Sequence, residues 1–131
     1  MVRGNVKENQ AKIDMPIGRS SKDRKKMAVD KNGKEAVTEF NVLKRYNGYT
    51  LLEVKIKTGR THQIRVHMAE ISYPIVGDYT YSNGKNPFGI VGQMLHAAKL
   101  KFVHPTTKEM VEFEAPLPEY FEHVLQELEN N

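Results

Sequence analysis

Alternating apolar and polar residues predict a chain built mostly from β-strands. The clearest pattern is a hairpin whose arms are residues 35–46 and 49–58, joined by Asn47-Gly48. In the second arm, Thr50 and the apolar residues at alternate positions up to Ile56 form one face, and mostly charged residues form the other. We therefore expect one buried and one wet face.

Shorter patterns predict further strands. We expect an edge strand at residues 11–15, a loop over residues 16–26, and a short strand at residues 27–29. That strand is followed by a turn at residues 30–34, where Asn32-Gly33 favours a type I′ turn, in which both central residues need a positive φ. A second hairpin is expected near the end of the chain, from residues 95–103 and 108–115.

Two segments have helical spacing. Thr61 is a candidate N-cap for a short helix over residues 62–70, with Ile64, Met68 and Ile71 on its apolar face. Residues 119–128 predict a C-terminal helix with acidic residues near its start, which the helix dipole favours. The predicted fold class is α+β, with a mostly antiparallel mixed sheet, a short helix after the central hairpin and a C-terminal helix, in a single domain of residues 1–131.

Composition limits the class of protein. The chain has 131 residues, of which 39% are hydrophobic and 27% charged, as in soluble globular domains. It has no cysteine, which favours a reducing, cytoplasmic location. The first ten residues lack the apolar core of a signal peptide, and no window approaches the roughly 18 apolar residues of a membrane span.

The net charge of +4 is unevenly distributed. Residues 1–67 hold sixteen Lys and Arg against seven Asp and Glu, whereas residues 68–131 hold four against nine. A basic half predicts a surface for a polyanion such as nucleic acid. The alternative, that these charges are simply solvated, is favoured by composition taken alone.

The densest cluster of functional groups is Thr58–His67, which contains two arginines, two histidines and a glutamine. We expect Arg65 to face a concave surface of the sheet, where its guanidinium needs a carboxylate or a phosphate. The alternative is a surface arginine paired with a nearby acid. His62 and His67 are five residues apart, a spacing unsuited to two metal ligands on one helical face, so no metal site is predicted.

Several segments, taken in order, resemble the RluA/RluD-type ribosomal RNA pseudouridine synthases. They are Ile13–Arg19, Gly33–Thr38 with Tyr49–Val54, Thr58–His67, Pro74–Asp78 and Leu95–Ala97. The Arg-Thr-His-Gln-Ile-Arg sequence is the most specific of them, and the resemblance covers nearly the whole chain.

The resemblance implies an enzyme that uses no cofactor or metal. In that family an aspartate within His-Arg-Leu-Asp attacks a uridine flipped out of the RNA, the glycosidic bond breaks, and the base is rejoined to the sugar through carbon. Arg65 would pair with that aspartate, and Ile64 and Leu95 would line the uracil pocket. The residues that would contact large-subunit ribosomal RNA or support the pocket are Arg19, Arg24, Lys25, Arg60, His62 and Gln63.

One expected feature does not occur in the sequence: no aspartate follows His-Arg-Leu. We therefore expect a fragment from the C-terminal portion of the catalytic domain, inactive alone, with an exposed edge or apolar surface that a second copy would cover. In the parent enzyme Arg65→Met is expected to abolish turnover and leave the fold largely intact. The alternative function is a non-catalytic RNA-binding module built on the basic half.

Overall fold

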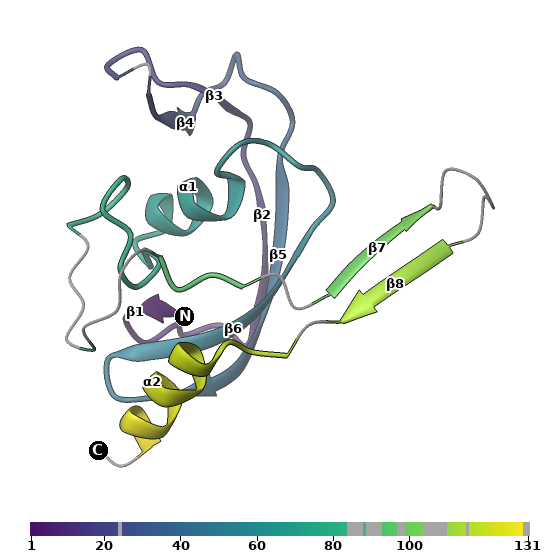
Figure 1. The fold of residues 1–131 in the computed structure, drawn as a ribbon. Coiled ribbons are helices and arrows are strands. Elements are labelled where there is room, and N and C mark those ends of the chain that lie inside the picture. Colours follow the sequence, from purple (N-terminus) through teal and green to yellow (C-terminus); the bar gives the residue numbers. More distant parts are fainter. Residues whose placement is uncertain are drawn as a thin grey trace. The chain divides into compact units, whose positions relative to one another are not determined.

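The computed structural model describes residues 1–23, 25–83, 88, 93–96, 99–103, 110–114 and 116–129. The chain divides into two compact units, Met1–Met94 and Leu95–Asn131. The elements, in order, are β1 (Val2–Arg3), β2 (Gln10–Asp14), β3 (Ile17–Arg19), β4 (Met27–Val29), β5 (Val37–Arg45), β6 (Tyr49–Ile56), α1 (Gln63–Glu70), β7 (Lys99–Val103), β8 (Met110–Glu114) and α2 (Glu119–Glu129) (Figure 1). Strand pairs between these elements are antiparallel throughout, so the α+β class is confirmed. The prediction of a single domain stays a prediction.

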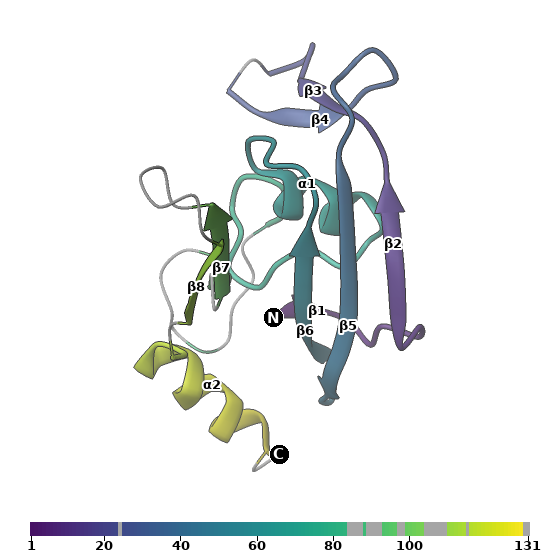
Figure 2. The same cartoon turned by 90° about the vertical axis from the view of Figure 1, so that its right-hand side faces the viewer.

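The first unit is organised around the predicted hairpin. Strands β5 and β6 are the central pair of a four-stranded sheet with the order β1-β6-β5-β2, and β2 lies at an edge as predicted (Figure 2). Register pairs Thr38 with Ile56 and Phe40 with Val54 on one face, where Thr38 and Phe40 are buried. The opposite face is wet: Glu39 is paired in register with Lys55 and forms an ion pair with Lys57. On the second arm the prediction holds in part: Thr50 is buried and Val54 is half-buried, but Ile56, expected on the same buried face, is 47% exposed.

The Asn32-Gly33 turn does not have the predicted conformation. Neither residue has a positive φ, so the predicted type I′ turn, which needs two residues in that region, is wrong. Gly33 is required for a different reason: a Cβ there would lie 2.4 Å from the carbonyl carbon of Ile17. The turn packs directly against the backbone of β3.

The segment predicted to open a loop is a strand. Residues Ile17–Arg19 form β3 and pair with β4 in a small two-stranded sheet, so the loop is confined to the connection between them. Ile17 is buried in a cluster with Ala36 and Val66, and Met27 and Val29 pack against it. The apolar contacts of this cluster attach the β3–β4 hairpin to α1.

Helix α1 begins one residue later than predicted, and its cap is different. Its N-cap is His62, with a left-handed φ of 55°, and no side chain caps the helix, so Thr61 does not have the predicted role. The buried residues are Gln63, Val66, His67 and Met68, whereas Ile64 and Ile71 are only half-buried. Of the predicted apolar face only Met68 is fully buried, because hydrogen-bonded polar side chains occupy part of the buried face.

The second unit contains the predicted hairpin and helix. Strands β7 and β8 pair from Lys99 opposite Glu114 to Val103 opposite Met110, and the residues between the strands lie outside the described part of the chain. Helix α2 matches its predicted bounds to within one residue, with buried Phe121, Val124 and Leu128 on its apolar face. Within the described ranges, no helix has the length and apolar character needed to cross a membrane.

Candidate active-site arginine and its surroundings

Arg65 forms a bidentate ion pair with Asp78 inside the first unit. Nε of Arg65 donates to Oδ2 of Asp78, and Nη2 donates to Oδ1, both at 2.9 Å. The Arg65 side chain is 12% exposed and that of Asp78 is 1% exposed. Helix α1 supplies the arginine, and the segment that follows the helix supplies the carboxylate. The anion that a sequestered guanidinium needs is therefore present within this chain.

The backbone holds Asp78 in place. The chain turns at Gly77, with a φ of 81°, after Ile75 bridges to Val2 of β1. Oδ1 of Asp78 then accepts hydrogen bonds from the N–H of Thr80 at 2.9 Å and of Tyr81 at 3.2 Å. Burial of the carboxyl acts to raise its pKa. The hydrogen bonds from Arg65 and these two N–H groups, with the arginine charge, outweigh burial and lower the pKa of Asp78.

Tyr81 connects the ion pair to its surroundings. Its ring centroid lies 5.2 Å from the guanidinium carbon of Arg65, within the range of a cation–π contact. Its hydroxyl oxygen accepts a hydrogen bond from the N–H of Met27 at 3.0 Å and lies 2.7 Å from Nδ1 of His62. Because the oxygen already accepts from Met27, the phenol proton can be donated to Nδ1. Burial and the nearby positive charge of Arg65 lower the pKa of His62, which favours the neutral imidazole that this bond requires.

Gln63 forms hydrogen bonds to two neighbouring segments of the fold, the loop before α1 and the start of β5. Its Oε1 accepts from Thr58 Oγ1 at 2.7 Å and from the N–H of Arg60 at 3.1 Å. Its Nε2 donates to the carbonyl of Val37 at 2.8 Å and to Thr38 Oγ1 at 3.0 Å. The residue is 3% exposed. Its amide is used entirely within the protein, so Gln63 supports the site in this structure.

His67 extends the hydrogen bonds around Gln63 to Met15 and also contacts Thr38. Its Nε2 lies 2.9 Å from the carbonyl oxygen of Met15, which can only accept, so Nε2 carries the proton. Nδ1 then accepts from Thr38 Oγ1 at 2.7 Å. The polar residues of Thr58–His67 thus divide into two groups, one that secures α1 to β5 and one, comprising His62 and Arg65, beside Asp78 and Tyr81.

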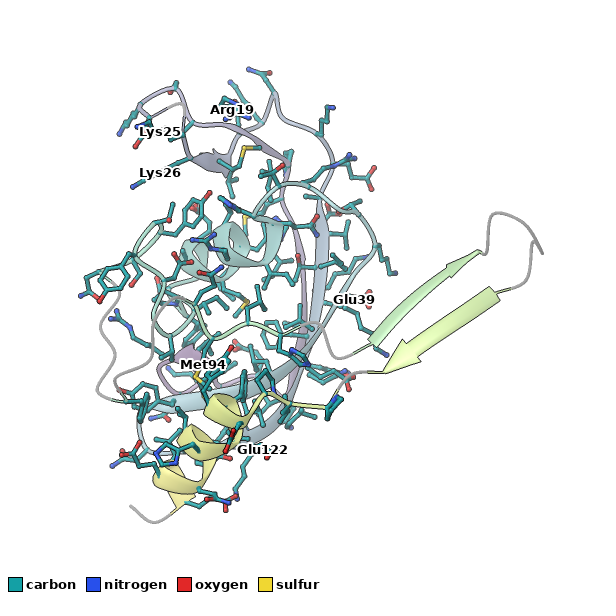
Figure 3. All side chains as sticks on the ribbon, viewed as in Figure 1. Arg19, Lys25, Lys26, Glu39, Met94 and Glu122 are labelled. Carbon is teal, nitrogen blue, oxygen red and sulfur yellow. The ribbon has the colours of Figure 1, made fainter. Side chains whose placement is uncertain are left out.

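The remaining predicted site residues lie in different places. Arg60 is half-buried, and its Nε donates to the carbonyl of Glu35 at 2.8 Å. Arg19 and Lys25 are exposed at the β3–β4 end of the first unit, where Lys26 also lies (Figure 3). Arg24 lies outside the described residues.

Ile64 and Leu95 were predicted to line one pocket. Both are half-buried, but Ile64 belongs to the first unit and Leu95 begins the second. Their shared role stays a prediction.

Sequence reasoning missed the two residues nearest to Arg65. Asp78 was singled out only as the end of the Pro74–Asp78 segment, and Tyr81 was given no role. The sequence offered one signal for Asp78: a sequestered arginine needs an anion, and Asp78 is the only aspartate that follows Arg65 in the sequence.

Comparison with known proteins identifies the family. The profile of the RNA pseudouridylate synthase family matches residues 2–70. The chain is 49% identical over 131 residues to the uncharacterized RNA pseudouridine synthase YlyB of Bacillus subtilis, covering all of this chain and 43% of that protein. It is 45% identical over 128 residues to the ribosomal large subunit pseudouridine synthase D of Neisseria meningitidis serogroup A, covering 89% of this chain and 34% of the relative. The chain thus spans less than half the length of these curated relatives.

Comparison with solved structures gives the same family. The human RNA pseudouridylate synthase domain containing 1 matches with a TM-score of 0.72 and 30% identity, over 99% of this chain and 63% of that one. The human RNA pseudouridylate synthase domain containing 4 has the same fold, with a TM-score of 0.74 and 24% identity over 98% of this chain and 59% of that one. By sequence and by fold, this chain belongs to the RNA pseudouridylate synthase family.

Proposed function

We propose that the complete product of the gene encoding this chain converts uridine to pseudouridine in RNA, with large-subunit ribosomal RNA as its substrate. The relatives that carry this activity in their names support the reaction class. The observation that carries the proposal is Arg65, which is largely buried, charged and held by only one edge of its guanidinium.

Arg65 has capacity for a second anion. Asp78 takes Nε and one N–H of Nη2, and among the described residues the arginine has no other hydrogen bond. The N–H groups of Nη1 and the second one of Nη2 form the outer edge of the planar fork. A carboxylate at that edge would be kept ionised and aimed by charge-assisted hydrogen bonds. In the proposed reaction this second anion is the aspartate that attacks the flipped uridine.

The attacking aspartate is not assigned to this chain. No His-Arg-Leu-Asp occurs in its sequence, and its own Asp78 is 1% exposed and fully engaged by Arg65 and two backbone N–H groups. The proposal therefore places the nucleophile in a part of the family's catalytic domain that these 131 residues do not include. It follows that the isolated chain would be inactive.

The basic β3–β4 end is the proposed RNA contact. Lysine and arginine side chains there would neutralise phosphates on either side of the target uridine and offset the cost of extruding it. Arg19 and Lys25 belong to this surface. Arg24, which lies outside the described residues, is proposed as a further RNA contact, and Ile64 and Leu95 would contact the uracil. We propose a cytoplasmic enzyme that needs no cofactor; self-association of the chain stays a prediction.

A tritium-release assay tests the activity. RNA transcribed with uridine tritiated at C5 loses the label to water when the new carbon–carbon bond forms at that carbon. We expect release by the complete gene product on large-subunit ribosomal RNA and none by the isolated chain. Release by the isolated chain would place a nucleophile within it and contradict the assignment above.

A non-catalytic RNA-binding module is the second candidate, and the exposed basic β3–β4 end favours it. The same assay separates the two functions. Salt-sensitive binding of RNA by the complete gene product, without tritium release from any ribosomal RNA substrate, would favour the binding module. Tritium release by the complete gene product favours the enzyme.

A further inference from the structure

The geometry points to Asp78 as a positioning residue for the reaction: it grips one edge of the Arg65 guanidinium and thereby turns the outer edge toward the attacking carboxylate. This inference rests on the proposed function and deepens it. Asp78 would not touch the substrate, because its side chain is 1% exposed and both of its oxygens are engaged.

The bidentate ion pair with Asp78 fixes both the position and the plane of the Arg65 guanidinium. An arginine side chain is long and flexible, and a single hydrogen bond would leave it free to swing. Here two parallel hydrogen bonds of 2.9 Å hold the Nε–Nη2 edge. The Tyr81 ring, at 5.2 Å, supports the guanidinium independently. Together these contacts leave one direction for the outer edge.

Asp78 is in turn held by backbone. The N–H groups of Thr80 and Tyr81 both donate to Oδ1, and the preceding Gly77 adopts a φ of 81° that places the carboxylate under α1. The backbone therefore fixes the orientation of Arg65 through Asp78, and backbone atoms move less than the atoms of another side chain would. Catalytic groups need this kind of support, because a displacement of about 1 Å lowers rates by about 100-fold.

The ion pair also changes what Arg65 offers a second anion. With Asp78 ionised, the pair carries no net charge, so Arg65 acts through the direction of its hydrogen bonds more than through long-range attraction. Removing the Asp78 charge would leave an uncompensated cation beside the attacking carboxylate. That carboxylate would then ionise at lower pH. The position and the charge of Asp78 therefore have separable effects.

Two substitutions of Asp78 in the complete gene product separate these effects. Asp78→Asn keeps an oxygen that can accept from Thr80 and Tyr81, but presents an N–H₂ group to the Nε–H of Arg65. Asp78→Glu keeps the charge and moves it by one methylene. Glu39→Gln is the matched control, since it removes a carboxylate from the exposed ion pair with Lys57.

We expect kcat to fall about 100-fold in Asp78→Asn, while KM for RNA keeps its wild-type value. The acid limb of its pH–rate profile should move to lower pH. Asp78→Glu should also lose kcat, with its acid limb at the wild-type position, and Glu39→Gln should match the wild type. His62, whose pKa is lowered by burial and by the charge of Arg65, lies in the same cluster, so the acid limbs of the pH–rate profiles are compared between variants.

A wild-type kcat in either Asp78 variant would overturn the inference. If a variant fails to fold, nitrogen-15 NMR of the wild-type protein decides. The Nε–H of Arg65 should be protected from exchange with water, and rapid exchange would equally overturn the positioning role. A wild-type protein that releases no tritium yet shows a protected Nε–H would instead count against the proposed function alone.

Discussion

The backbone N–H of Met27 in β4 donates a hydrogen bond to the hydroxyl oxygen of Tyr81, across 54 residues of sequence, at 3.0 Å. This bond ties the β3–β4 hairpin, which carries the basic residues, to the loop that carries Asp78. Because the Tyr81 ring also lies beside the Arg65 guanidinium, one side chain links the proposed RNA contact to the proposed catalytic arginine. The first prediction follows from this link.

Tyr81→Phe removes the hydroxyl and keeps the ring. The N–H of Met27 and Nδ1 of His62 would both lose a partner, so we expect a loss of about 1–3 kcal/mol in the free energy of unfolding. Urea denaturation followed by circular dichroism measures it. Tyr79→Phe is the control, because Tyr79 is 73% exposed. Equal unfolding midpoints for the two variants would show that the bond to Met27 contributes nothing.

Arg65→Met should destabilise the fold, contrary to the expectation from sequence that it would leave the fold largely intact. Removing the arginine leaves the Asp78 carboxylate buried without its ion-pair partner. Breaking a buried ion pair lowers the free energy of unfolding by about 3–5 kcal/mol. We expect the double variant Arg65→Met with Asp78→Asn to recover part of that loss. Thermal and urea denaturation of the two single variants and the double variant measure the coupling. Losses that simply add would mean that the two side chains do not stabilise each other.

Gln63→Met should cost stability although the two side chains are similar in size. The amide makes four hydrogen bonds inside the protein, and each group left unpaired costs about 1–3 kcal/mol. Gln10→Met on the exposed edge strand is the matched control. Unfolding free energies of the two variants give the comparison. Similar values would contradict the role of Gln63 in securing α1 to β5.

The chain with a free N-terminal amine should lose stability as the pH falls from 8 to 5. Burial lowers the pKa of the Met1 amine from 8.0 to about 5, so the folded chain binds the proton less readily than the unfolded chain. Between these values the unfolded chain is favoured progressively, by roughly 4 kcal/mol at most, and below pH 5 the effect levels off. Nα-acetylation removes the titrating group. Unfolding midpoints of the two forms across this range should converge above pH 8.

Lys25→Ala should weaken RNA binding and make it less sensitive to salt. If Lys25 contacts a phosphate, its loss reduces the slope of log K against log salt by about 1. Lys12→Ala, on an exposed position of β2, is the control. Fluorescence anisotropy at several potassium concentrations measures both. An unchanged slope in Lys25→Ala would remove this residue from the RNA contact.

The sequence by itself determined those strands and helices that a short pattern of neighbouring residues specifies. Alternating residues marked the β5–β6 hairpin, its wet face and the edge strand β2, and helical spacing marked α2 within one residue. The Arg-Thr-His-Gln-Ile-Arg segment also indicated the family that the comparisons identified. Each of these signals lies within a short window, because the period of a strand or helix repeats over a few residues.

Only the tertiary structure decided which polar groups meet. The strand β3 has too few residues to show a period and is stabilised by pairing with β4 and by Gly33 against its backbone. Gln63 and His67 became part of a buried face because partners from β5 and Met15 satisfy them. Asp78 reaches Arg65 only when the turn at Gly77 folds the chain back under α1. Contacts of this kind depend on distances in space, which no local pattern of residues encodes.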